Sequence, residues 1–158
     1  MASSEKNLST YSQKNVQDIS NKTFSIIVAE WNEEITHSLY NGAYETLLQH
    51  GASKENIIRV DVPGSYELTY AAQKMAQKNK IDAVICIGCV IRGETKHNDY
   101  ISHAVAQGLT HVSMKYDKPV IFGVLTPNTM KQALDRSGGT FGNKGDEAAI
   151  TAIKMLSI

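Results

Sequence analysis

Short apolar runs alternate along the chain with segments whose apolar residues recur every three or four positions. The runs at 23–30, 56–64, 82–91 and 119–125 are rich in β-branched residues, which predicts four strands. The third run, DAVICIGCVI, is almost wholly apolar, as is typical of a parallel strand covered on both faces. The pattern therefore predicts a sheet with this strand near its centre.

The segments between these runs predict amphipathic helices. After the first strand, Ile35, Leu39, Ala43 and Leu47 share one helical face, and Gly51 follows as a C-cap. Further helices are predicted over 66–78, from about residue 98 to 112, and from Pro127 to about Arg136 after an N-cap at Thr126. A last helix is predicted after the glycine-rich segment 137–145 and carries Ala149, Ala152, Ile153 and Leu156.

Strand and helix alternate along the chain after residue 20, which predicts one α/β domain over 21–158. Its mainly parallel four-stranded sheet carries helices on both faces, in a flavodoxin-like three-layer arrangement. Residues 1–20 are rich in Ser, Asn, Gln and Lys. We expect them to form a mobile or partner-dependent N-terminal segment.

Charge and cysteine content narrow the range of partners and compartments. Lys plus Arg and Asp plus Glu number 16 each, so no attraction to nucleic acid or to an anionic membrane is expected. No apolar run approaches the roughly 18 residues of a membrane span, and the N-terminal segment lacks the apolar part of a secretion signal. With two cysteines in all, the chain is expected in the cytoplasm.

Four short segments lie at the edge of the predicted sheet where ligands bind. In an open parallel sheet this edge is formed by the carboxyl ends of the strands. The segments are Trp31-Asn32, Pro63 to Glu67, Arg92 to Asn98, and Leu125 to Pro127. The third of them follows the apolar run abruptly and reads RGETKHN, with hardly an apolar atom. We therefore look for binding and catalytic residues in these segments.

Cys86 and Cys89 form a C-x-x-C pattern inside the third apolar run. A redox pair of this kind opens a helix, whereas residues i and i+3 of a strand point to opposite faces. A metal site would need further soft ligands, and the chain has no second cysteine pair. We expect two structural thiols, of which Cys89, near the strand end, can touch a ligand without reacting.

The loop after the third strand carries a glycine, a hydroxyl group and a histidine. Gly93 allows a tight turn, and free N–H groups at the next helix start would favour a phosphate near Glu94 and Thr95. The alternative is a simple loop in which Thr95 caps the helix. His97 lies where the helix dipole disfavours imidazolium, so it is a candidate neutral base or proton shuttle. On spacing alone, an exposed histidine without a role stays open.

Further candidates lie at or beyond the other strand ends. Trp31, the only tryptophan, could stack on a planar heterocycle or close the edge of the core. Ser65 and Glu67 could bind hydroxyl groups or open the second helix. Arg136 and Lys144 flank SGGTFGNKG, and Arg136 could bind phosphate or complement its helix dipole. Neither a P-loop nor a strand-following G-x-G-x-x-G is present, so no nucleotide site is predicted.

Together these segments resemble the lumazine synthase family, the 6,7-dimethyl-8-ribityllumazine synthases of riboflavin biosynthesis. The matching pieces follow the family's order and are AEWN (29–32), VPGSYE (62–67), IGCVIRGETKHNDY (87–100), PVIFGVLT (119–126) and DRSGGTFGNKGDEAA (135–149). Two positions depart from the pattern. Asn98 stands where many members have an aromatic residue, and Trp31 stands where Phe is frequent, which preserves stacking.

The resemblance implies a transferase that joins 5-amino-6-(D-ribitylamino)uracil to 3,4-dihydroxy-2-butanone 4-phosphate, releasing phosphate and water, without metal or organic cofactor. It implies that His97 shuttles the proton and that Gly93, Glu94, Thr95 and Arg136 hold the phosphate. The residues implied to bind the pyrimidine and ribityl groups are Trp31, Asn32, Ser65, Tyr66, Glu67, Cys89, Val90, Ile91, Phe122 and Lys144.

The resemblance also implies a homo-oligomer. In the family, sites lie at the interfaces of a pentamer, and Phe122 and Arg136 would come from the neighbouring subunit. A pentamer, a decamer, a 60-subunit shell and association with riboflavin synthase all stay open. The alternatives are a non-catalytic flavin- or lumazine-binding protein and a shell-forming protein on the same fold. A related enzyme that dismutates lumazine would leave Arg136 and the RGET loop without a purpose, because it releases no phosphate.

Overall fold

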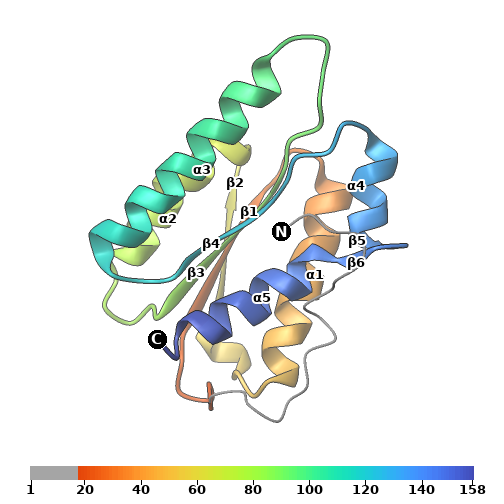
Figure 1. Cartoon of the computed structure of the whole chain (residues 1–158). Helices are drawn as coiled ribbons and strands as arrows, with labels where there is room; N and C mark the ends of the chain where they lie inside the picture. The colour runs from red at the N-terminus through yellow and green to blue at the C-terminus, as the bar shows by residue number, and fades with distance from the viewer. Residues whose placement is uncertain (1–17) are drawn as a thin grey trace.

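A computed structural model of the chain describes residues 18–158 (Figure 1). Its elements are β1 (Phe24–Ala29), α1 (Glu33–Gln49), the 3₁₀ turn η3 (Lys54–Asn56), β2 (Ile57–Val62), the 3₁₀ turn η4 (Ser65–Glu67), α2 (Leu68–Ala76), β3 (Ala83–Cys89), α3 (His97–Tyr116), β4 (Val120–Leu125), α4 (Met130–Arg136), β5 (Ser137–Gly139), β6 (Gly142–Asn143) and α5 (Lys144–Met155). The alternation predicted from the hydrophobic pattern is confirmed.

The main sheet has four parallel strands in the order β2-β1-β3-β4. Ala29 pairs with Val62 and Cys89 pairs with Leu125, so the four strands end at one edge. β3 is buried along its whole length, as its apolar sequence predicted. Each connection between parallel strands contains a helix, which carries the chain back to the other edge of the sheet.

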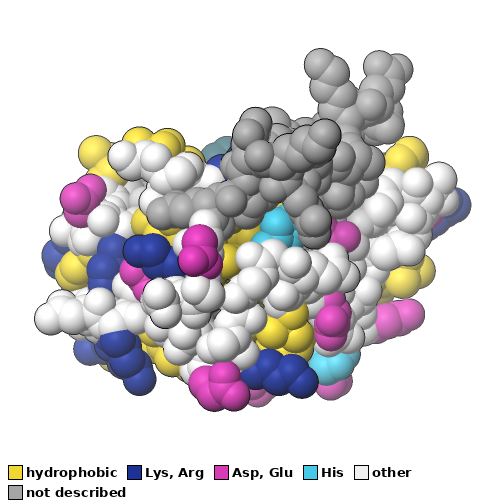
Figure 2. Space-filling view, turned by 90° about the horizontal axis from the view of Figure 1, so that it is seen from below, with side chains coloured by type: hydrophobic (Ala, Val, Ile, Leu, Met, Phe, Trp, Pro, Cys, Tyr) yellow, Lys and Arg dark blue, Asp and Glu magenta, His cyan; other side chains and the backbone are white. Residues whose placement is uncertain are grey.

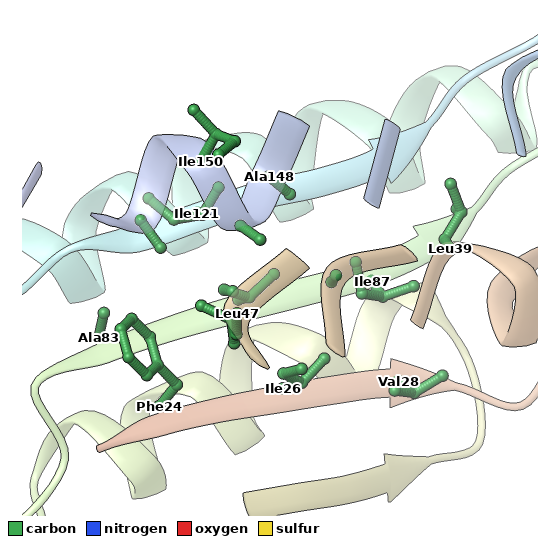
Figure 3. Packing of buried hydrophobic residues seen from close by; sticks show 14 of the residues in the cluster. Phe24, Ile26, Val28, Leu39, Leu47, Ala83, Ile87, Ile121, Ala148 and Ile150 are labelled. Atoms are coloured by element: carbon green, nitrogen blue, oxygen red, sulfur yellow. The ribbon is translucent and has the colours of Figure 1, made fainter. Parts of the chain in front are cut away.

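Each face of the sheet is covered by a pair of helices, which gives three layers (Figure 1). On one face, α1 and α5 pack over residues such as Phe24, Ile26 and Val28 of β1, as Figure 3 shows. On the other face, α2 and α3 pack over a second core that includes Ile27. Alternate residues of β1 thus enter opposite cores, as a strand's period of two requires.

The packed domain includes Ile19, which is fully buried in the core beside α1 and α5. The domain was expected to start at residue 21, after a mobile or partner-dependent segment. Residues 1–17 of that segment lie outside the described residues. The core therefore reaches at least two residues further toward the N-terminus than the expected boundary.

Two helix starts differ from the sequence prediction. The fourth helix does not begin at Thr126-Pro127, because the Pro127 carbonyl accepts the N–H of Arg92 and the chain stays beside the end of β3. It begins at Met130, and Thr129 caps it by accepting the N–H of Gln132. The second helix opens with the 3₁₀ turn η4, in which Ser65 makes no side-chain capping bond.

The glycine-rich segment that follows α4 forms a small antiparallel hairpin of β5 and β6. The last residue of the hairpin, Asn143, donates from its side-chain amide to the Ser38 carbonyl of α1 at 2.9 Å. The side-chain oxygen of Asn143 accepts the N–H of Gly145. A Cβ on Gly145 would lie 1.8 Å from the Leu39 carbonyl, so glycine permits the close approach of α5 to α1. The hairpin therefore fixes Arg136 and Lys144, which flank it, against the rest of the domain.

Acidic and basic side chains are interspersed with hydrophobic ones over the face of the molecule seen in Figure 2. This mixture agrees with the balance of 16 basic and 16 acidic residues in the sequence.

Candidate functional site

A hollow of about 580 Å³ opens at the carboxyl ends of β1 and β3, beside the start of α3. We call it the first hollow, and its volume lies within the range of roughly 300–1,000 Å³ that is typical of small-molecule sites. It is lined by Trp31, Asn32, Gly64, Ser65, Tyr66, Glu67, Cys89, Val90, Ile91, Gly93, Thr95, His97, Asn98 and Ile101. Three of the four segments predicted at the ligand edge therefore meet here.

Trp31 presents its ring to this hollow directly after β1. The side chain is 72% exposed, so it does not close the core edge, which was the alternative interpretation. Its backbone N–H donates to the Pro63 carbonyl at 3.2 Å, which extends the pairing of β1 with β2. The indole face is therefore available for stacking on a planar ring.

The end of β3 offers backbone groups to the hollow. The N–H groups of Val90 and Arg92 point toward β4, where they donate to the carbonyls of Leu125 and Pro127 at 2.8 and 3.0 Å. Because N–H groups alternate along an extended chain, that of Ile91 points the other way, and it has no partner among the described residues. Ile91 thus carries a free donor on the side of the first hollow.

The turn η4 forms a second wall of the hollow. Ser65 is 6% exposed and packs against Gly88 of β3, where a Cβ would lie 2.6 Å from its hydroxyl oxygen. The capping role considered for Ser65 is therefore wrong, and its place is between the hollow and the strand. Tyr66 and Glu67 are exposed on the same wall, where both can reach a bound molecule.

The loop between β3 and α3 supplies further donors. The backbone N–H groups of Gly93, Glu94, Thr95 and Lys96 have no hydrogen-bond partner among the described residues, and α3 begins directly after them. Such groups favour an anion. The Thr95 hydroxyl accepts the N–H of His97 at a long 3.4 Å, so it caps the helix start weakly. Gly93 and Thr95 line the hollow, whereas the exposed Glu94 does not.

His97 is the first residue of α3 and the only histidine among the residues that line the first hollow. Its neighbour Asn98 donates from its side-chain amide to the Asp99 carboxylate at 2.9 Å. Asn98 and Ile101 were not predicted as site residues. The spacing offered a signal for Ile101, which lies one helical turn beyond His97 and thus on the same face.

The two cysteines face opposite cores, as the strand periodicity predicted. Cys86 packs in the core under α2 and α3, and Cys89 packs in the core under α1 and α5. Both thiols are free. Burial raises the pKa of Cys89 to about 12 and raises that of Cys86 even further, so neither forms a thiolate near neutral pH.

A second hollow of about 700 Å³ follows the open edge of β4, between α4 and α5. Its lining includes Phe122, Arg136 and Lys144, all of which the resemblance assigned to the substrate site. Lys144 pairs with the nearly buried Glu147 at 2.5 Å. Arg136 donates to the Gln132 carbonyl at 3.3 Å, and its guanidinium lies 5.0 Å from the ring centre of Phe141.

The predicted site residues thus fall into two groups within the chain. Apart from Glu94, those at the ends of β1, β2 and β3 line the first hollow, whereas Phe122, Arg136 and Lys144 line the second. Thr126 and Pro127, which were expected at the ligand edge, also line the second hollow. Glu147 was not predicted, although it stands three residues after Lys144, the spacing of paired charges on a helix.

Among residues 18–158, no three His, Cys, Asp or Glu side chains are grouped as metal ligands would be. Within the same range, no helix combines the length and apolar character needed to cross a bilayer.

The parallel sheet and the hollow at its strand ends define the class of this protein, the α/β proteins that bind small molecules at the carboxyl edge of a sheet. A model of the 6,7-dimethyl-8-ribityllumazine synthase family matches residues 21–158. The chain is 59% identical to the 6,7-dimethyl-8-ribityllumazine synthase of Cytophaga hutchinsonii, with 99% of this chain and 98% of that protein covered.

Proteins with the same description in two other organisms are nearly as similar. The one from Parabacteroides distasonis is 52% identical, with 99% of this chain and 98% of that protein covered. The one from Flavobacterium johnsoniae is also 52% identical, with 100% and 83% covered. The chain belongs to the 6,7-dimethyl-8-ribityllumazine synthase family.

Proposed function

We propose that this chain condenses 5-amino-6-(D-ribitylamino)uracil with 3,4-dihydroxy-2-butanone 4-phosphate to 6,7-dimethyl-8-ribityllumazine, releasing phosphate and water. The observation that carries this proposal is the first hollow, which combines an exposed indole, free backbone donors and a histidine. The match to the family over residues 21–158 supports the same reaction. It favours the enzyme over a non-catalytic flavin carrier or a pure shell protein.

The pyrimidine and its ribityl chain bind in the first hollow. The ring stacks on Trp31, which is exposed there, and its polar edge meets the backbone groups of Cys89, Val90 and Ile91. The hydroxyl groups of the ribityl chain bind along η4, where Ser65, Tyr66 and Glu67 line the wall. Hydroxyls have suitable partners there, because this wall carries hydroxyl and carboxylate groups.

His97 moves protons during the condensation. The amine of the pyrimidine attacks the ketone and forms an imine with loss of one water, and phosphate is then eliminated. The ribityl-bearing nitrogen attacks the carbonyl that remains and closes the ring with loss of a second water. Each of these steps transfers a proton at nitrogen or oxygen, and a histidine can both accept and donate one near neutral pH. His97 suits this role because it lines the hollow at the start of α3.

The phosphate of the second substrate binds at the loop of Gly93, Glu94 and Thr95. The free N–H groups of this loop donate to it, but no Lys or Arg is among the residues that line the first hollow. A phosphate dianion is usually paired with a cationic side chain, and a guanidinium fits it best. We assign this partner to Arg136 of a neighbouring subunit.

The complete site is therefore shared between two copies of the chain. Arg136, Phe122 and Lys144 lie together in the second hollow along the unpaired edge of β4, where a neighbouring subunit can dock. A ring of identical contacts of this kind closes as a cyclic oligomer. We propose the pentamer, which leaves decamers, 60-subunit shells and association with riboflavin synthase as further assembly, and we propose the cytoplasm as its compartment.

The reaction is tested by mixing the purified protein with the two substrates. Lumazine absorbance and phosphate release are followed together, against the spontaneous reaction without protein. We expect both signals to rise together and well above the uncatalysed rate. A rate equal to the spontaneous one would refute the proposed reaction.

A further inference from the structure

Asn32, between β1 and α1, has a backbone conformation that few residues adopt. Its φ of 60° and ψ of 47° are left-handed, and Asp117 is the only other non-glycine residue with positive φ among residues 18–158. L-residues disfavour this conformation because of Cβ contacts, and asparagine and aspartate tolerate it best after glycine. A position that suits glycine is occupied here by a residue with a hydrogen-bonding side chain.

The side chain of Asn32 does not cap the helix that it precedes. It makes no hydrogen bond to α1, although the Asn32 carbonyl accepts the N–H groups of Ile35 and Thr36. Instead, its amide nitrogen donates to the carbonyl of Cys89 at 2.9 Å, across 57 residues of sequence. The usual use of asparagine at a helix start is thus given up for a bond to β3.

This bond bridges a gap that opens in the sheet at the edge of the first hollow. The pairing of β1 with β3 ends at Val28 and Ile87. Just beyond β1, the N–H groups of Glu30 and Trp31 donate to the carbonyls of Val62 and Pro63, on the β2 side. Without a further donor, the Cys89 carbonyl would lose its partner on the β1 side. The amide of Asn32 takes the place of the missing backbone donor.

Two groups that contact substrate in the proposed function depend on this bridge. The ring of Trp31 is 72% exposed, so packing does little to orient it, and its backbone is held between the Pro63 carbonyl and the anchored Asn32. On the other side of the bridge, the Cys89 carbonyl lies on the same edge of its strand as the free N–H of Ile91. One hydrogen bond thus links the stacking ring to the backbone donors opposite.

We propose that Asn32 is a positioning residue, which sets the distance between Trp31 and the end of β3 and so determines how well the flat pyrimidine is bound. The inference rests on the proposed function for its ligand. The claim that the amide of Asn32 restricts the motion of Trp31 can be tested on the protein without any substrate. Trp31 is the only tryptophan in the chain, so its fluorescence reports on this junction without a label.

Two substitutions separate the effect of the Asn32 side-chain amide from the effect of its left-handed backbone conformation. Asn32→Gly keeps the left-handed conformation accessible and removes the amide, whereas Asn32→Asp keeps size and conformation and replaces the donor by an acceptor. Asp117→Gly is the matched control, since it changes a left-handed residue at the far end of α3, away from the hollow. Thermal melting of each full-length protein verifies that it is folded.

In both Asn32 variants we expect faster local depolarisation of Trp31 fluorescence and a KM for the pyrimidine raised about fivefold, the effect of losing one ordinary hydrogen bond. The KM for the phosphate substrate and kcat should stay as in the parent protein, and Asp117→Gly should change none of these. Parent-like fluorescence and kinetics in both variants would overturn the proposal. So would an equal rise in KM for both substrates.

The fluorescence measurement keeps this inference separate from the proposed reaction. If the parent protein catalyses no condensation, the proposed function fails, while depolarisation in Asn32→Gly still tests the restraint on Trp31. If catalysis is present and the Trp31 signal is unchanged, the positioning role fails and the reaction stands.

Discussion

At the scale of single residues, proton transfer in the first hollow is assigned to its one histidine, which stands beside free backbone donors. His97 lies at the start of α3, and His103 lies further along the same helix with its ring bonded to the Asp99 carbonyl at 2.7 Å. We expect His97→Ala to lower kcat by roughly 10²-fold or more, because general acid–base catalysis contributes about that much. His103→Ala should keep the parent rate, and unchanged kcat in His97→Ala would remove that residue from proton transfer.

The buried thiols give a prediction about pH. Burial raises the pKa of Cys89 from its ordinary 9.0 to about 12 and raises that of Cys86 further. Because the folded state keeps these protons to higher pH than the unfolded chain, the free energy of unfolding falls as the pH rises above 9.0. We expect slow alkylation of the folded protein at alkaline pH and rapid alkylation of both thiols in denaturant. Rapid labelling without denaturant would show that the thiols are accessible.

At the scale of elements, β3 and η4 are coupled through Gly88. A Cβ at this position would meet the Ser65 hydroxyl oxygen at 2.6 Å and Leu68 at 3.1 Å. We expect Gly88→Ala to lower the free energy of unfolding by about 1–3 kcal/mol through overpacking. It should also raise the KM for the pyrimidine substrate, because Ser65 is pushed toward the hollow.

The control for this change is Gly93→Ala, where the added methyl group meets nothing within 4 Å. Its denaturant midpoint should match that of the parent protein. If Gly88→Ala and Gly93→Ala have equal stability, η4 moves aside without loss of folding free energy. The packing of η4 on Gly88 then does not determine the shape of the hollow.

Much of the element pattern could be predicted because it depends on local periodicity. The continuous apolar run of β3 indicates a strand buried on both faces. The helical spacing of Ile35, Leu39 and Ala43 indicates the buried face of α1. The start of α4 could not be predicted in this way. Thr126-Pro127 has the sequence of a helix start, but a long-range hydrogen bond from Arg92 to Pro127 keeps the chain extended.

The candidate site was predictable where it depends on strand ends, since parallel strands bring their carboxyl ends to one edge. The bond from Asn32 to Cys89 has no local signal, because 57 residues separate its partners. The grouping of Lys144 with Phe122 and Arg136 along β4 likewise follows from how the hairpin and α5 pack. Sequence position alone made Arg136 and Lys144 candidates, whereas only the resemblance to a family pointed to Phe122 beforehand.

At the scale of the whole molecule, the residue proposed to bind the phosphate lies apart from the residues proposed to bind the pyrimidine. Arg136 lines the second hollow, whereas Lys131 of the same short helix is solvent-exposed and pairs with Asp135 at 2.9 Å. We expect Arg136→Ala to raise the KM for the phosphate substrate about tenfold or more, because hydrogen bonds to charged groups contribute about 1.5–3 kcal/mol. Lys131→Ala removes the same charge nearby and should leave that KM unchanged. An effect confined to pyrimidine binding would contradict the phosphate role of Arg136.

The shared site is tested most directly by combining two impaired chains. His97→Ala and Arg136→Ala are each assembled alone, and the two are then co-assembled in equal amounts. Turnover per subunit is measured with the phosphate substrate well below its parental KM, where both separate variants are slow. If one subunit supplies His97 and its neighbour supplies Arg136, roughly a quarter of the sites in a mixed ring carry neither substitution. We expect the mixture to regain about that fraction of parental turnover. Activity no higher than the mean of the two separate variants would contradict a site built from two subunits.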